Sequence, residues 1–105
     1  MESLRIKKGD TTPKLDFDLD KMEFSLEGES RSEDVLTFYE PIIKWLDNFK
    51  EWFLKNGSSE KLEFQFKLEY YNSSSAKFIF SIFKRLKEMQ VKGLEITMFW
   101  FYDVF

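Results

Sequence analysis

Four consecutive polar residues are the part of the chain whose types and spacing best suit a chemical role. Asn72, Ser73, Ser74 and Ser75 stand between an alternating segment typical of a strand and a segment with helical spacing. A helix N-terminus has unpaired amide donors and about half a unit of positive charge, so it stabilises an anion placed there. A hydroxyl at this position can therefore accept a phosphoryl group, which adds about two negative charges and three acceptor oxygens.

The same residues also have a purely structural interpretation. One Ser or Asn is enough to cap a helix, and on the residues alone a well-capped helix that follows a polar turn is the more common explanation. Lys77, close by in the sequence, either pairs with a phosphate or is simply solvated. The residues alone leave both interpretations open.

A second set of chemically interesting residues is acidic. Asp16, Asp18, Asp20 and Glu27 occupy the first, third, fifth and twelfth positions of a calcium-loop pattern. The sixth position, which needs glycine for its sharp turn, is Lys21, and the residues between the acids alternate as in a strand. We interpret these acids as the solvated face of a hairpin and expect no metal and no cofactor. A carboxylate-based, divalent-metal-dependent enzyme is kept as an alternative.

Composition narrows the possible functions. The 105 residues contain no Cys and no His, which excludes disulfides, thiolate or imidazole zinc sites and nucleophile triads that need histidine. Four glycines form neither a phosphate-binding loop nor a dinucleotide fingerprint. We therefore expect a protein without catalytic activity.

A net charge of -3 gives no reason to expect nucleic-acid binding. Without a signal peptide or long apolar run in the sequence, we expect a cytoplasmic protein with no membrane contact.

Hydropathy patterns predict the elements that must position the serine cluster. Alternation predicts a hairpin from residue 15 to about 28 and a strand over 61–71, whose apolar face would include Tyr70. Helical spacing predicts one helix over 32–57, capped by Ser32 and ending at Gly57, and another over 72–93. Pro41 either kinks the first helix or marks its true beginning. The apolar segment 94–105 is predicted to be a strand, and the stripe expected on the second helix is Ala76, Ile79, Phe80, Phe83 and Leu86.

The order of these elements predicts an α/β fold. We expect a single domain over 1–105 that forms a two-layer sandwich. Its four-stranded mixed sheet would combine a hairpin with a parallel crossover and carry two main helices on one face. Residues 1–12 are expected to be loosely tethered.

The many aromatic residues, 13 Phe, 4 Tyr and 3 Trp, exceed what the predicted core obviously needs. Trp45 and Trp52 are seven residues apart on one helix face and either widen the core or form a partner-binding ridge. In the last strand, one of two alternating aromatic sets must meet the open sheet face, another segment or another protein. A plain interaction module that forms a homodimer through this strand is therefore a further alternative. The candidate partner surface is Trp45, Trp52, Tyr71, Phe99 and Phe101.

Several motifs in this order resemble the SiaC family of bacterial regulatory phosphoproteins. They are TP at 12–13, LxFD at 15–18, FSLxGxS at 24–30, FYxPIIxWL at 38–46 and, above all, LEYYNSSSAK at 68–77. The resemblance spans nearly the whole chain. It departs from the family at Glu29, where the family usually has arginine, and at the C-terminus, where family members commonly continue with an acidic tail. We expect either a truncated chain or a naturally short member.

The resemblance implies a partner-switching adaptor with no catalysis of its own. In this family a cognate kinase phosphorylates a hydroxyl in an NTSS motif, and a metal-dependent Ser/Thr phosphatase removes the phosphate. The unmodified form binds and activates a diguanylate cyclase, which raises cyclic-di-GMP and favours biofilm formation. Alignment of NTSS on Asn72 to Ser75 places the family's phosphorylated threonine on Ser73, where serine keeps the hydroxyl.

Overall fold

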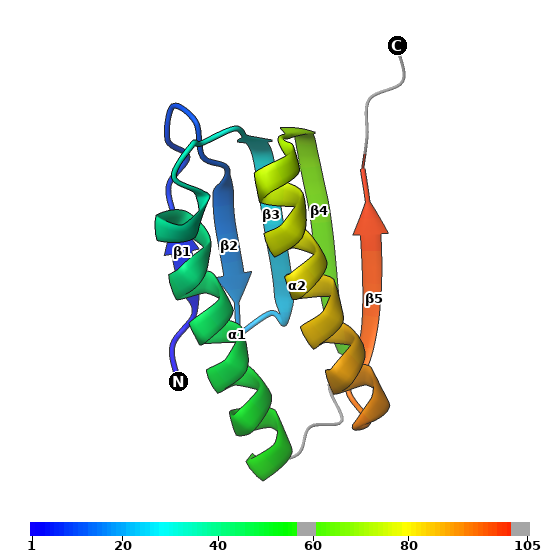
Figure 1. Ribbon diagram of the computed structural model, residues 1–105. Coiled ribbons are helices and arrows are strands. Elements are labelled where there is room, and N and C mark those ends of the chain that lie inside the picture. Colours follow the sequence, from blue (N-terminus) through cyan, green and yellow to red (C-terminus); the bar gives the residue numbers. More distant parts are fainter. Residues whose placement is uncertain (57–60, 102–105) are drawn as a thin grey trace.

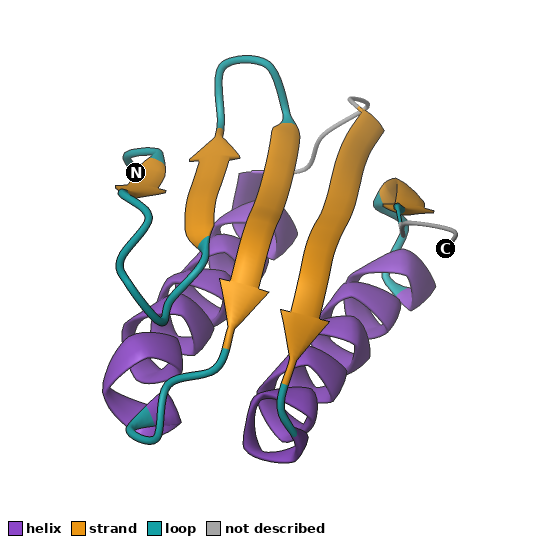
Figure 2. Ribbon diagram, turned by 90° about the horizontal axis from the view of Figure 1, so that it is seen from above, coloured by secondary structure: helices purple, strands orange, loops and turns teal. Residues whose placement is uncertain are grey.

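Two helices cover one face of a five-stranded sheet, as Figures 1 and 2 show in two orientations. The computed structural model describes residues 1–56 and 61–101. The expected helix stop at Gly57 and residues 102–105 of the expected last strand lie outside the described residues. The elements are β1 (Leu4–Ile6), β2 (Lys14–Asp18), β3 (Glu23–Ser30), α1 (Val35–Asn56), β4 (Lys61–Tyr71), α2 (Ser73–Val91) and β5 (Glu95–Trp100).

The strands lie side by side in sequence order, which confirms the predicted α/β class. β1, β2 and β3 pair antiparallel, whereas β3 pairs parallel with β4 and β4 parallel with β5. Each parallel pair is joined through a helix. The expected count of four strands was one too low, because Leu4–Ile6, within the segment 1–12 that was expected to be loosely tethered, pairs with β2. Because β1 has only three residues, its sequence shows no periodic pattern from which a strand could be predicted.

The first helix runs without a break from Val35 through Pro41 to Asn56, so the alternative in which the helix begins at Pro41 is wrong. Asp34 caps this helix in place of the predicted Ser32. The carboxylate of Asp34 accepts hydrogen bonds from the backbone N–H and the hydroxyl of Thr37, at 3.3 and 2.7 Å. Ser32 instead accepts from the N–H of Asp34 at 3.2 Å, one step before the cap.

The core lies between the helices and the sheet. The residues that α2 contributes to this core differ in part from the predicted stripe. Ile79 and Leu86 are buried as expected, but Phe80 is 70% exposed. The remaining inward positions are occupied by Ser75, Ile82 and Met89. Hydrophobicity favours a buried stripe that includes Phe80, whereas the fold buries the helix face that carries Ser75.

Strand β4 alternates between buried and more exposed side chains as predicted up to Leu68. Leu62, Phe64, Phe66 and Leu68 are buried, but Tyr70 is 45% exposed, contrary to the prediction. The pairing register with β3 shifts after Gly28, so that one residue of β4 is left over. An extra residue of this kind reverses which face the following side chains occupy.

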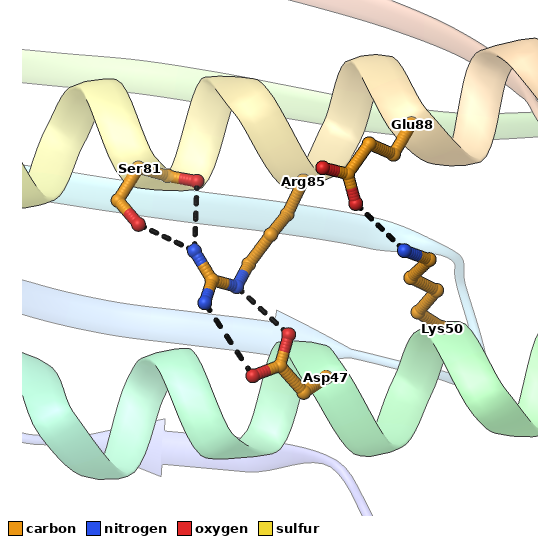
Figure 3. Close-up of polar contacts among 5 residues, drawn as sticks. All are labelled: Asp47, Lys50, Ser81, Arg85 and Glu88. Atoms are coloured by element: carbon orange, nitrogen blue, oxygen red, sulfur yellow. Dashed lines mark hydrogen bonds and ion pairs between the residues drawn. The ribbon is translucent and has the colours of Figure 1, made fainter.

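Polar contacts join the two helices above the core (Figure 3). Arg85 of α2 donates to Asp47 of α1 at 2.8 Å and also contacts Ser81. Lys50 of α1 donates to Glu88 of α2 at 2.6 Å. The Lys50 ammonium lowers the pKa of the Glu88 carboxyl below its ordinary range, first through this hydrogen bond and then through its charge. These contacts link α1 and α2 on their solvent side.

The different burial of two phenylalanines gives a direct test of this packing. Phe64→Ala should lower the free energy of unfolding by about 3–5 kcal/mol, because it empties a fully buried site. Phe80→Ala should change it by about 0.5 kcal/mol or less, because most of that ring is in solvent. Urea denaturation followed by circular dichroism measures both. A loss at Phe80 as large as that at Phe64 would contradict the observed orientation of α2.

Candidate functional site at the strand-to-helix junction

The serine cluster lies where β4 passes into α2. Asn72 is the N-cap of α2, and its side-chain oxygen accepts from the backbone N–H of Ser75 at 2.8 Å. Ser73 and Ser74 are the first two helical residues, so their N–H groups have no partner within the helix. The predicted position of the cluster at a helix N-terminus is confirmed.

Strand β3 holds this junction in place. The backbone N–H of Asn72 donates to the carbonyl oxygen of Ser30 at 3.0 Å. The side-chain amide of Asn72 donates to the carbonyl oxygen of Ser32 at 3.3 Å. Asn72 therefore connects the start of α2 to the end of β3, two segments about 40 residues apart in the sequence.

Three buried hydroxyls form a chain of hydrogen bonds beneath the junction. Ser75 donates to the carbonyl oxygen of Ser30 at 3.2 Å, and the Ser30 hydroxyl donates to Ser75 at 2.7 Å. Because the single proton of Ser30 is used in this way, the bond between Ser30 and Tyr39, at 2.8 Å, takes its proton from Tyr39. Burial raises the pKa of the Tyr39 phenol, which keeps this proton in place.

The three serines differ in access to solvent. Ser75 has no exposed surface, whereas Ser73 and Ser74 are exposed. A modifying enzyme can therefore reach the first two hydroxyls but not the third. Lys77, one helical turn after Ser73, is also exposed, so its ammonium group can approach a phosphate on Ser73.

The two tryptophans of the candidate partner surface lie on α1 in different environments. Trp45 packs against Phe17 and Phe24, with ring centroids 5.4 and 5.3 Å apart, and its Nε1 donates to the carbonyl oxygen of Glu2. Trp45 therefore widens the core, which was one of the two interpretations. Trp52 stacks on Phe49 and is 38% exposed.

The aromatic residues near the last strand divide between the two faces of the sheet. Tyr71 and Trp100 contact each other on the helix side, with ring centroids 6.1 Å apart, and line a shallow groove beside Phe80. Phe99 and Phe101 stack at 6.3 Å, and the ammonium of Lys67 lies 5.5 Å from the Phe101 ring. Because Lys67 belongs to the polar face of β4, Phe99 and Phe101 are the aromatic set on the open face.

The acids of the hairpin are paired with a cation. Asp16 and Asp18 lie 3.2 and 3.1 Å from the guanidinium of Arg5. The backbone N–H of Lys21 lowers the pKa of the Asp18 carboxyl, and the Arg5 charge lowers it further. Within residues 1–56 and 61–101, no group of three or more acidic side chains is arranged to hold a metal ion. Neither described helix is long and apolar enough to cross a membrane.

The sequence did not reveal Ser30 and Tyr39 as parts of the site. Their hydroxyls meet Ser75 only after β3, α1 and α2 have packed together. Both residues belong to motifs quoted for the family resemblance, at 24–30 and 38–46, but those motifs do not show that the two hydroxyls lie beside the serine cluster. The junction as a whole combines two exposed serine hydroxyls at a helix N-terminus with a buried, hydrogen-bonded support.

Comparisons with known proteins agree with this description. The family model for SiaC family regulatory phosphoproteins matches residues 6–104, and the chain therefore belongs to this family. An uncharacterised protein of Pseudomonas aeruginosa strain UCBPP-PA14 is 29% identical, and the match covers 98% of this chain and 78% of that protein.

Solved structures of SiaC from P. aeruginosa have the same fold. The crystal structure of apo-SiaC gives a TM-score of 0.85 at 27% identity, over 98% of this chain and 81% of the other. A chain in the crystal structure of the diguanylate cyclase SiaD in complex with its activator SiaC gives a TM-score of 0.77 at 25% identity. This match covers 90% of the present chain and 74% of that chain. The resemblance inferred from the motifs is thereby confirmed.

Two alanine substitutions, two residues apart, test the support of the junction. Ser75→Ala should lower the free energy of unfolding by about 1–3 kcal/mol, because it leaves buried hydrogen-bonding groups of Ser30 without their partner. Ser73→Ala, the matched control, should change it by about 0.5 kcal/mol or less. Urea denaturation of both variants provides the measurement, and equal effects would show that the buried chain does not support the junction.

Proposed function

We propose that this protein is a non-catalytic adaptor whose binding to a diguanylate cyclase is controlled by phosphorylation of Ser73. The unmodified form binds and activates the cyclase, which raises cyclic-di-GMP and favours biofilm formation. A cognate kinase adds the phosphate and a Ser/Thr phosphatase removes it. Membership of a family of regulatory phosphoproteins and the complex of its relative SiaC with SiaD support the proposal.

The observation that carries the proposal is the exposure of Ser73 at the first position of α2, with Ser75 buried two residues later. A phosphate on Ser73 lies over backbone amides that have no partner in the helix, and it lies within reach of Lys77. The helix therefore stabilises the modified state without any rearrangement of the core.

The switch follows from charge and desolvation. The phosphate stands beside the groove lined by Tyr71, Phe80 and Trp100, which a partner has to dehydrate when it binds there. A doubly charged group at the rim of such an interface opposes dehydration and repels acidic groups of the partner. About 2.7 kcal/mol is enough to change the dissociation constant a hundredfold.

The chemistry at Ser73 has to come from another enzyme. No carboxylate within the described residues is hydrogen-bonded to the serine hydroxyls of the junction, and the chain has no histidine. A serine hydroxyl without a neighbouring base is a weak nucleophile. This supports a role as the substrate of a kinase.

The two alternatives have less support. A carboxylate-based metal enzyme would use Asp16, Asp18 and Asp20. Two of these acids are paired with Arg5, and within the described residues no group of three or more acids is arranged to hold a metal ion. A homodimer through the last strand agrees with the place of β5 at the sheet edge and with the exposure of Phe99 and Phe101, but it gives the serine cluster no role.

Phosphorylation of Ser73 is tested by incubating the protein with its cognate kinase and ATP, followed by tandem mass spectrometry. One phosphate is expected on Ser73, because this hydroxyl is accessible and lies at the helix N-terminus. Ser73→Ala should lose the label, whereas the matched control Ser74→Ala should keep it. Label on the Ser73→Ala variant, or none on the native protein, would refute the assignment.

Activation is tested by the rate at which the cognate diguanylate cyclase forms cyclic-di-GMP. The unmodified protein should raise this rate and the kinase-treated protein should not, because the phosphate prevents binding. Ser73→Ala treated with kinase should still activate. If the unmodified protein leaves the rate unchanged, the adaptor role is wrong.

A further inference from the structure

The side of α2 that faces away from the core carries a regular and unusual set of residues. Positions three and four apart on a helix lie on one face, and here such a series faces solvent along the whole length of α2. We refer to these residues as the α2 outer face. They are Ser73, Lys77, Phe80, Lys84, Lys87 and Val91, all of them exposed.

Two members of this face are apolar. Phe80 is 70% exposed and Val91 is 77% exposed, and together with Phe83 they line a groove of about 570 Å³ between α2 and the end of α1. On the side of α2 that faces β5, Phe80 also borders the groove that contains Tyr71 and Trp100. Exposed apolar side chains therefore recur along α2. Phe83 also packs against Phe66 of the core, whereas Phe80 and Val91 lie largely in solvent.

The charges around this groove are predominantly positive. Lys84, Lys87 and Lys92 line it, and none of them has an ion-pair partner among the described residues. The groove also contains Lys50 and Glu88, but these two pair with each other at 2.6 Å (Figure 3). A protein with a net charge of -3 thus presents a local excess of positive charge beside exposed apolar side chains.

Helix stability explains only part of this arrangement. A lysine at the C-terminal end of a helix interacts favourably with its dipole, which accounts for Lys92 at the C-cap but not for Lys84 or Lys87. The dipole gives no reason for a phenylalanine in solvent at the middle of the same face. Apolar side chains with a basic border are instead the complement of an acidic, partly apolar protein surface.

We propose that the α2 outer face is the docking surface for the output partner, and that the partner contacts it with a segment whose apolar side chains are flanked by Asp and Glu. Phe80 and Val91 would be covered by the apolar side chains, and Lys84 and Lys87 would pair with the carboxylates. A protein is favoured over a nucleic acid because the chain as a whole is acidic.

The position of Ser73 on this face explains how its phosphate acts, and this step rests on the proposed function. Ser73 precedes Phe80 by seven residues, about 10 Å along the helix axis. That distance is close to the Debye length of about 8 Å at physiological ionic strength. The carboxylates beside Lys84 and Lys87 would lie about 16 and 21 Å from Ser73 along the axis, where salt screens the phosphate charge. The phosphate therefore acts on the part of the partner that covers Phe80 and the first turns of α2, by opposing its dehydration there.

Charge reversal tests the docking surface. Lys84→Glu/Lys87→Glu should weaken binding of the cognate cyclase about tenfold or more. The matched control, Lys14→Glu/Lys67→Glu, makes the same change in net charge on the open face of the sheet and should alter binding about twofold or less. Isothermal titration calorimetry measures both. If the control variant loses affinity instead, the open face with Phe99 and Phe101 is the docking surface and the inference is wrong.

A synthetic probe tests the chemistry without the cyclase. The probe is a helical peptide with leucines on one face and glutamates on both sides of them, and its counterpart has lysines in place of the glutamates. In ¹⁵N-correlation spectra, the acidic peptide should shift the amide signals of residues 77–91, and the basic peptide should not. Equal shifts with both peptides, or shifts elsewhere, would overturn the inference.

The outcomes separate this inference from the proposed function. If Ser73 is not phosphorylated but Lys84→Glu/Lys87→Glu still weakens cyclase binding, the docking surface stands and the switch fails. If Ser73 is phosphorylated and the double variant binds normally, the switch stands and this surface is wrong. Two further results would overturn the docking surface. If the native protein sediments with anionic phosphatidylglycerol vesicles and the double variant does not, the surface binds a lipid. If the native protein self-associates and the double variant does not, the surface binds a second copy of the chain.

Discussion

The hydrogen bonds among Tyr39, Ser30 and Ser75 are the constraint on which the rest of the site depends. They join α1, β3 and α2 inside the core, where an unpaired hydroxyl costs about 1–3 kcal/mol. With Ser75 fixed inward, the helical rotation of about 100° per residue turns Ser73 to solvent. The same rotation directs Lys77, Phe80, Lys84 and Val91 outward. An inward contact therefore determines which residues the protein presents to its partners.

Strong periodicity made most of the fold predictable from the sequence. The hairpin, β4 and both helices followed from alternation or helical spacing, and the serine cluster was placed correctly at the start of α2. The errors occurred where tertiary contacts decide. Leu4–Ile6 becomes a strand only because β2 pairs with it, and Tyr70 faces outward because of a register shift. Phe80 looked like a core residue because hydrophobicity alone does not show which helix face meets the sheet.

The aromatic side chains now fall into two groups. Phe17, Phe24, Phe64 and Phe66 are fully buried and hold the helices on the sheet. A second group is exposed around α2 and β5, on the helix side or on the open face of the sheet: Phe80, Trp100, Phe99 and Phe101. The proposed adaptor role would use such exposed aromatic surfaces for binding a partner.

The central claim is that charge at Ser73 itself controls the binding of the cyclase. The most direct measurement compares the affinity of the cognate cyclase for the unmodified protein and for two forms with genetically encoded phosphoserine, one at position 73 and one at position 74. The account predicts that phosphoserine at 73 raises the dissociation constant about a hundredfold, a change of about 2.7 kcal/mol in binding free energy. Phosphoserine at 74, which points to a different side of α2, should have a much smaller effect. Equal affinities of the unmodified protein and the form phosphorylated at 73 would contradict the account.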